Sequence, residues 1–335
     1  MAIRYGKRVY HCGPSETVLE ALRRQGVELA YSCTKGTCQT CMLRADGGAV
    51  PPEAQAELKD TLRAQGYFLP CVCVPGQDLE LAPPDGEAGF FPALVMEAER
   101  LAEDVRRLRL RQIKPLSYRA GQFIHLRRAD GLLRSYSLAS LPGRDRDLEL
   151  HVKYLRGGRM TTWIFQDLRP GERVEIRGPS GSCFYTEDRP EQPLLLIGTG
   201  TGLAPLMGIA RDALNRGHTG PIHLYHGTRD PGGLYQKLEL EWWATQHGNF
   251  HFVPCLSGAE VPRDCRMGRA DEVAFAAHPD LGGWRVFLCG CPPMVHAAKK
   301  RAYLAGADLA QIHADPFELR DLGESAKSRK SPLPQ

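Results

Sequence analysis

The chain has 335 residues, of which 42% are apolar and 11 are cysteine, and its formal net charge is +4. The apolar share is enough to fill real cores and excludes a disordered chain. The small charge, with no basic run interleaved with aromatic residues, argues against nucleic-acid binding. The longest apolar run, Leu194–Ile197, is far shorter than the ~20 residues of a spanning helix. The amino terminus has no apolar signal core, so we expect a cytoplasmic protein without membrane insertion.

Two stretches rich in proline and glycine, 83–86 and 189–193, divide the chain into three parts of domain size. The last residues are polar and contain few apolar groups, as is typical of a disordered tail. The sequence therefore predicts domains over 1–86, 90–190 and 191–320, and a disordered tail over 321–335.

The first part is expected to be a small α+β domain. Strand-like runs at Ala2–Tyr5 and Arg8–His11 come before a helix, which is signalled by a capping box of Thr17 and Glu20. Gly26 is positioned to end that helix.

The second part has the pattern of an antiparallel β-barrel. In Val105–Arg111 leucines alternate with arginines, which indicates a half-buried strand. Further strand runs occur at Phe123–Leu126, Leu148–Tyr154 and Arg173–Ile176, separated by glycine and proline. A tight turn is expected at Gly178–Gly181.

The third part predicts an α/β domain with a parallel sheet. Short apolar runs at Leu194–Ile197, Ile222–Tyr225 and Val286–Leu288 are each followed by a helical pattern. Glycines that follow a parallel strand let the backbone approach a pyrophosphate at a helix amino terminus. Gly198-Thr-Gly200-Thr201-Gly202 stands directly after the first of these runs.

Eleven cysteines in a cytosolic protein suggest metal or redox chemistry before disulfides. Cys33, Cys38 and Cys41 have the spacing C-x₄-C-x₂-C, and Cys71 follows 30 residues later, which is the plant-type [2Fe–2S] spacing. A zinc site or a set of buried structural thiols is the alternative, although zinc sites usually show paired C-x₂-C units and the second half here offers only Cys71-x-Cys73.

The second part also contains residues suited to a flavin nucleotide. In Arg134-Ser-Tyr136-Ser137, arginine can grip a pyrophosphate, tyrosine can stack on a flat ring and serine can hydrogen-bond a ring nitrogen. Gly158 and Thr161 belong to a glycine loop that opens a helix, where backbone N–H groups can hold phosphate.

These motifs carry a resemblance in all three parts. The first part resembles plant-type ferredoxins, which implies a β-grasp fold, Cys71 as the fourth ligand and Cys73 as a small core residue. The other two parts resemble the ferredoxin–NADP reductase superfamily. That resemblance implies that Arg134 binds FAD phosphate, Tyr136 stacks on the isoalloxazine and Ser137 faces flavin N5. It also places Gly158 and Thr161 at the pyrophosphate. At the position of Thr161 the family usually has serine.

The same resemblance assigns the nucleotide site. Gly198, Gly200, Thr201 and Gly202 would hold the pyrophosphate. Cys289, in a Cys-Gly-Cys-Pro-Pro-Met segment, would lie beside the nicotinamide C4, and Phe317 would cover the flavin. Ser137, Thr201 and Cys289 are thus the residues expected to act in hydride transfer. Arg229 could bind a 2′-phosphate, but the usual acid before Leu-Tyr is replaced by Gly233, so NADH is favoured and NADPH stays possible.

The order of the three modules resembles the reductase components of multicomponent oxygenases. The resemblance implies an NAD(P)H oxidoreductase, monomeric in isolation, in which hydride passes from NADH to FAD. Single electrons then pass through the [2Fe–2S] cluster to a terminal oxygenase or hydroxylase. Two alternatives stay open. The partner could be a deoxysugar dehydrase or another metalloenzyme, or the chain could be a redox sensor or carrier that binds the cofactors without turnover.

Overall fold

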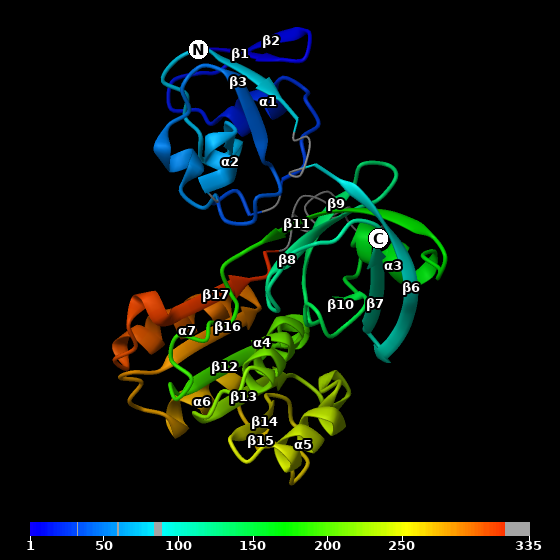
Figure 1. Cartoon of the computed structure of the whole chain (residues 1–335), viewed down its shortest axis with the longest axis vertical. Coiled ribbons are helices and arrows are strands. Elements are labelled where there is room, and N and C mark those ends of the chain that lie inside the picture. The colour runs from blue at the N-terminus through cyan, green and yellow to red at the C-terminus, as the bar shows by residue number, and fades with distance from the viewer. Residues whose placement is uncertain (32, 59, 84–88, 319–335) are drawn as a thin grey trace, which may run out of the picture.

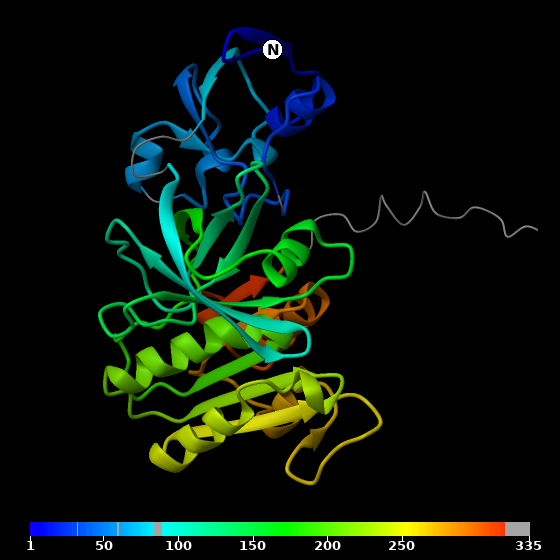
Figure 2. The ribbon, with the colours of Figure 1, turned by 90° about the vertical axis from the view of Figure 1, so that its right-hand side faces the viewer.

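The structure, a computed structural model, describes residues 1–31, 33–58, 60–83 and 89–318 (Figure 1). The predicted linker at 84–86 and the predicted disordered tail at 321–335 lie outside these residues. Both views show three bodies stacked along the long axis of the molecule, with a β-barrel between a small amino-terminal domain and a parallel-sheet domain (Figures 1 and 2). The predicted multidomain fold is confirmed.

The amino-terminal domain is built on a five-stranded sheet in the order β2-β1-β5-β3-β4. The capping box is present, because the Thr17 side chain accepts from the Glu20 backbone and the Glu20 side chain accepts from the Thr17 backbone. Ile3, Leu22 and Phe68 are completely buried and form part of the core. The elements are β1 (Ala2–Tyr5), β2 (Arg8–His11), α1 (Val18–Arg24), β3 (Leu43–Gly47), α2 (Asp60–Ala64), β4 (Tyr67–Phe68) and β5 (Leu79–Ala82).

The middle domain is an antiparallel sheet in the order β10-β7-β6-β11-β8-β9. A bridge between Leu138 and Leu150 joins the two ends of that order, so the sheet closes into the predicted barrel. Leu108 and Leu110 are buried, whereas Arg107, Arg109 and Arg111 are half-buried, as the alternation indicated. The elements are β6 (Phe91–Ala102), β7 (Val105–Gln112), β8 (Phe123–Arg127), β9 (Leu133–Ser137), β10 (Leu148–Lys153), α3 (Arg159–Gln166) and β11 (Arg173–Ser180).

The expected turn at Gly178–Gly181 is wrong. Strand β11 continues to Ser180 and keeps its pairing with β8, with a register shift between Arg177 and Ser180. A bulge of this kind accommodates the one extra residue and redirects a side chain without ending the strand. Arg177 is the last residue of β11 that pairs with β8 before this bulge.

The carboxy-terminal domain has a six-stranded parallel sheet in the order β15-β14-β13-β12-β16-β17. Core clusters lie on both of its faces, one with α4 and α5 and the other with α6 and α7. Such double coverage explains why the central strands are continuous apolar runs. The elements are β12 (Leu194–Thr199), α4 (Leu203–Asn215), β13 (Ile222–Thr228), α5 (Lys237–Gln246), β14 (Phe250–Leu256), β15 (Arg266–Met267), α6 (Ala270–Ala277), β16 (Arg285–Gly290), α7 (Pro292–Leu304) and β17 (Ile312–Pro316).

In the described part of the chain, no helix has the length and apolar character needed to cross a bilayer.

Candidate functional site

One cavity of about 1260 Å³ is lined by residues from all three domains. It exceeds the usual range of about 300–1,000 Å³ for a small-molecule site, so it has room for a flavin and a nicotinamide together. The predicted cofactor residues that line it are Cys33, Cys38, Arg134, Tyr136, Ser137, Gly158, Thr161, Gly200, Thr201 and Phe317. Those that do not line it are Cys41, Cys71, Gly198, Gly202 and Cys289.

The four predicted cluster cysteines converge at the barrel-facing end of the amino-terminal domain. The Cys33 side chain lies beside those of Cys38 and Cys71, and that of Cys41 lies beside Cys71. The backbone N–H groups of Lys35 and Cys38 both donate to the Cys33 sulfur at 3.4 Å. Amide donors aimed at sulfur are the surroundings that iron–sulfur thiolates need, so the residues fit the cluster.

Among the described residues, no three His, Cys, Asp or Glu side chains are placed to share a single metal ion. A [2Fe–2S] cluster needs only two thiolates on each iron, because bridging sulfides supply the other two ligands of each iron. Cys73, in contrast, is completely buried in the core of the domain, and burial raises the pKa of its thiol to about 12. The predicted core location of Cys73 is confirmed.

The Arg-x-Tyr-Ser motif lies on β9, beside the cavity. The Ser137 hydroxyl donates to Oδ2 of Asp315 at 3.0 Å, which joins the barrel to β17 of the carboxy-terminal domain. Burial raises the pKa of Asp315 to about 6, although the hydrogen bond from Ser137 acts in the opposite direction. Asp315 lines the cavity, and sequence reasoning missed it. In the sequence, the one feature that could have pointed to Asp315 is its place two residues before Phe317, in the terminal segment.

The predicted phosphate loop precedes α3 as expected. Gly158 is the N-cap and offers no side-chain cap, so the first N–H groups of the helix are available to an anion. The Thr161 hydroxyl already serves the loop, since it accepts from the Leu155 N–H at 3.1 Å and contacts the Gly158 carbonyl at 3.1 Å. Thr161 therefore shapes the loop, and phosphate would have to share or displace these contacts.

The nucleotide loop turns sharply between β12 and α4. Gly200 has φ +54, which favours glycine, and a Cβ there would meet nothing closer than Lys153 at 3.9 Å. Gly202 is different, because a Cβ at this position would lie 2.2 Å from the Cys289 carbonyl oxygen. Gly202 thus lets the loop pack directly on the end of β16.

This contrast gives a prediction for the two glycines. Gly202→Ala must push the loop away from β16, so we expect a loss of about 1–3 kcal/mol in the free energy of unfolding. The displaced loop should also raise the KM for NADH by about tenfold or more. Gly200→Ala is the control, with a backbone cost of only about 1 kcal/mol. Thermal unfolding and steady-state kinetics measure both effects, and equal behaviour of the two variants would contradict the packing argument.

Cys289 is completely buried at the end of β16, with its sulfur 3.7 Å from that of Cys183. Gly290 and Cys291, the next two residues, line the cavity instead. Cys291 is the N-cap of α7, and its N–H donates to the Thr199 hydroxyl at 3.0 Å. Phe317 lies at the same end, where its N–H donates to the Gly290 carbonyl at 2.7 Å.

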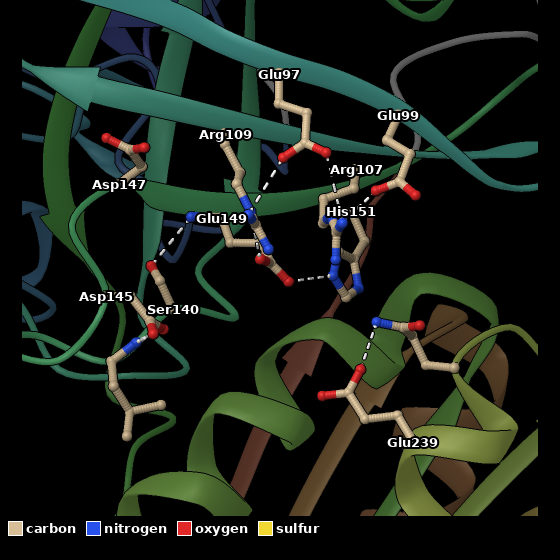
Figure 3. A network of polar contacts seen from close by, with 12 residues as sticks. Glu97, Glu99, Arg107, Arg109, Ser140, Asp145, Asp147, Glu149, His151 and Glu239 are labelled. Atoms are coloured by element: carbon tan, nitrogen blue, oxygen red, sulfur yellow. Dashed lines mark hydrogen bonds and ion pairs between the residues drawn. The ribbon is translucent and has the colours of Figure 1, made fainter.

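A polar network lies on the barrel where it meets the carboxy-terminal domain (Figure 3). Its centre is Glu149 on β10, which accepts from Arg109 at 3.2 Å and contacts Nε2 of His151 at 3.0 Å. Arg109 also pairs with Glu97 at 3.2 Å. Nδ1 of His151 lies 3.2 Å from the Tyr235 hydroxyl, which belongs to the carboxy-terminal domain. Hydrogen bonds thus fix the contact between the two domains that line most of the cavity.

Three family models match successive parts of the chain. They are a 2Fe-2S iron-sulfur cluster binding domain over residues 3–76, an oxidoreductase FAD-binding domain over 92–185 and an oxidoreductase NAD-binding domain over 196–300. The predicted cofactors, FAD, NADH and a [2Fe–2S] cluster, are confirmed at the level of these domains.

Whole proteins match the full arrangement. The reductase subunit of an aromatic O-demethylase from Amycolatopsis sp. is 38% identical over 332 residues, which covers 94% of this chain and 98% of that protein. The reductase component of a naphthalene 1,2-dioxygenase system from Pseudomonas putida is 32% identical and covers 95% and 98%. The crystal structure of the Amycolatopsis cytochrome P450 reductase GcoB is 37% identical, covers 95% and 98%, and superposes with a TM-score of 0.69. The chain belongs to the family of NAD(P)H-dependent iron–sulfur flavoprotein reductases that serve oxygenase systems.

Proposed function

We propose that this chain takes hydride from NADH and delivers single electrons through its [2Fe–2S] cluster to the terminal oxygenase or hydroxylase of a multicomponent system. The observation that carries the proposal is the single cavity lined at once by the cysteine loop, the flavin motif on β9 and the nucleotide loop after β12. When bound, the flavin supplies the step between two-electron and one-electron chemistry, and the chain supplies binding, orientation and electrostatics.

The assignment of residues is part of the proposal. Cys33, Cys38, Cys41 and Cys71 hold the cluster, supported by the convergence of their side chains. At the flavin end, Arg134 binds phosphate, Tyr136 stacks on the ring and Ser137 presents its hydroxyl to the flavin edge while it donates to Asp315. The amino terminus of α3, with Gly158 and Thr161, holds the pyrophosphate of the flavin nucleotide.

At the nucleotide end, Gly198, Gly200, Thr201 and Gly202 shape the loop that holds the nicotinamide nucleotide. Cys289 supports this end from behind the cavity wall, since it is completely buried. Phe317 lines the cavity and is the proposed cover of the flavin face.

Three further proposals concern the domain boundaries, the location of the protein and its preferred nucleotide. The domain boundaries at 1–86, 90–190 and 191–320 are supported by the three separate sheets. A cytoplasmic location is supported by eleven cysteines that form no disulfide. A preference for NADH over NADPH is supported by Gly233, although Arg229 lines the cavity and could meet a 2′-phosphate.

An anaerobic titration with NADH tests the function. We expect one equivalent to bleach the flavin absorbance, and the electron paramagnetic resonance (EPR) signal of a reduced [2Fe–2S] cluster to grow in step. Purified protein should also reduce cytochrome c rapidly. If FAD and cluster are present and NADH reduces neither, the chain is a sensor or carrier. If NADH reduces both, and reconstitution drives a dehydrase or another metalloenzyme but no oxygenase, the partner class is wrong.

A further inference from the structure

Arg177 joins the flavin barrel to the loop that carries three of the proposed cluster ligands. It lies at the bulge of β11 and is only 4% exposed. Its Nη2 donates to the backbone carbonyl oxygens of Gln39 at 3.0 Å and Thr40 at 3.2 Å. Since these two residues stand between Cys38 and Cys41, the guanidinium holds the loop by its backbone.

Two further contacts connect the same surfaces. The Ser180 hydroxyl donates to Oε1 of Gln39 at 2.9 Å, and the hydroxyls of Thr40 and Ser135 lie 3.4 Å apart. Ser135 is the second residue of the Arg-x-Tyr-Ser motif, and successive strand residues point to opposite faces. The strand that presents the flavin-binding side chains therefore also contacts the cluster loop.

The charge of Arg177 has a notable set of neighbours. Burial lowers the pKa of Arg177 to about 10, so it stays protonated at neutral pH, and the positive charge of Arg127 acts in the same direction as burial. Within the described residues, Arg177 forms no ion pair with a carboxylate. A buried cation without an opposite charge is unfavourable. An iron–sulfur cluster held by the neighbouring cysteine loop would be negative, because of its thiolates and sulfides, and would supply that charge.

We infer that Arg177 is a positioning residue for electron transfer from the flavin to the cluster. It docks the Cys38–Cys41 loop on the barrel, and its charge favours the reduced cluster, which is one unit more negative than the oxidised one. In this step one electron leaves the flavin and enters the cluster, no bond forms or breaks, and Arg177 keeps its proton. The inference rests on the proposed cluster ligands.

The test uses the full-length protein with both cofactors. Arg177→Gln removes the charge, Arg177→Lys keeps it with fewer donors, and Ser180→Ala removes one docking contact without changing charge. Arg127→Gln is a matched control, because Arg127 stacks on the same Phe90 ring but binds Glu175 instead of the cluster loop. The measurements are an EPR-monitored redox titration, hydrogen exchange of residues 33–41, and reduction of cytochrome c and of ferricyanide.

We expect Arg177→Gln to lower the midpoint potential of the cluster and to speed exchange in the loop. Cytochrome c reduction should fall by about tenfold to a hundredfold, while ferricyanide reduction stays at the wild-type rate. Arg177→Lys should keep the potential and loosen the loop, and it serves as the decisive variant if Arg177→Gln does not fold. Ser180→Ala should loosen the loop alone.

Two outcomes overturn the inference, and they differ from a failure of the proposed function. Wild-type potential and exchange in both Arg177 variants, equal to those of Arg127→Gln, would show that Arg177 only fills the interface. The same holds if Arg127→Gln shifts the potential as much as Arg177→Gln. A wild-type protein without the cluster EPR signal would instead refute the ligand assignment itself.

Discussion

Serine in place of Cys71 is expected to abolish the EPR signal and the visible absorbance of the cluster. Cys71 lies in the short 3-10 helix Pro70–Val72 that follows β4, and its side chain lies beside those of Cys33 and Cys41, so it is proposed to complete the ligand set. Cytochrome c reduction should fall by about a hundredfold or more, because the cluster that passes single electrons to this acceptor is absent. Ferricyanide reduction should persist, since that acceptor can take electrons from the flavin.

Cys73 provides the matched control, two residues away. It is completely buried in a core that includes Ile3 and Phe68. Cys73→Ser should keep the full cluster signal and cost about 1–3 kcal/mol in the free energy of unfolding, because it buries a hydroxyl among apolar groups. A cluster that survives Cys71→Ser and is lost in Cys73→Ser would reverse the assignment. Wild-type protein that holds zinc here would contradict it altogether.

The fold was readable from the sequence wherever the signal is local. Alternation over Val105–Arg111, the capping box at Thr17 and the apolar run at Leu194–Ile197 all describe neighbours along the chain, and each element forms where predicted. The cysteine spacing is local too, except for Cys71. The turn expected at Gly178–Gly181 failed because glycine and proline mark a bulge as readily as a turn, and pairing with β8 decided between them.

The parts that the sequence could not predict depend on contacts between distant segments. Arg177 meets Gln39 across 138 residues, and Ser137 meets Asp315 across 178 residues. Composition shows that an arginine or an aspartate exists but not which surface it faces after three domains assemble. For the same reason the Cys-Gly-Cys segment suggested a cysteine in the site, while the fold buries Cys289 and brings its neighbours to the cavity.

Replacing Asp315 by asparagine is expected to make the protein more stable at neutral pH and no more stable in acid. The pKa of Asp315 is raised from 3.8 to about 6, chiefly by burial. Between these two values the folded protein binds more protons than the unfolded chain, so stability falls as pH rises through that window. Above pH 6 the ionised carboxylate costs at most about 3 kcal/mol, and Asp315→Asn removes that cost.

Thermal or denaturant unfolding at pH 7.5 and at pH 3, below the unfolded pKa of 3.8, measures this effect. The gain of Asp315→Asn should be present at the higher pH and should disappear at the lower one. Asp212→Asn is the control, for which we expect a change of stability in the opposite direction. The Asp212 carboxylate is also buried, but it pairs with Arg216 at 2.7 Å. Loss of that ion pair should therefore destabilise the protein. A gain at pH 7.5 that persists in full at pH 3 would show that the effect does not come from ionisation.

A carboxylate kept in the cavity at a cost to stability needs a function to retain it. Asp315 accepts the hydroxyl of Ser137, the residue proposed to face the flavin edge, so its charge orients that hydroxyl. We therefore expect the more stable Asp315→Asn protein to reduce its flavin more slowly with NADH in stopped-flow measurements. Ser137→Ala should slow the same step without the gain in stability, because it leaves the carboxylate buried and takes away its hydrogen bond. Together, the two variants separate the charge of Asp315 from the position of Ser137.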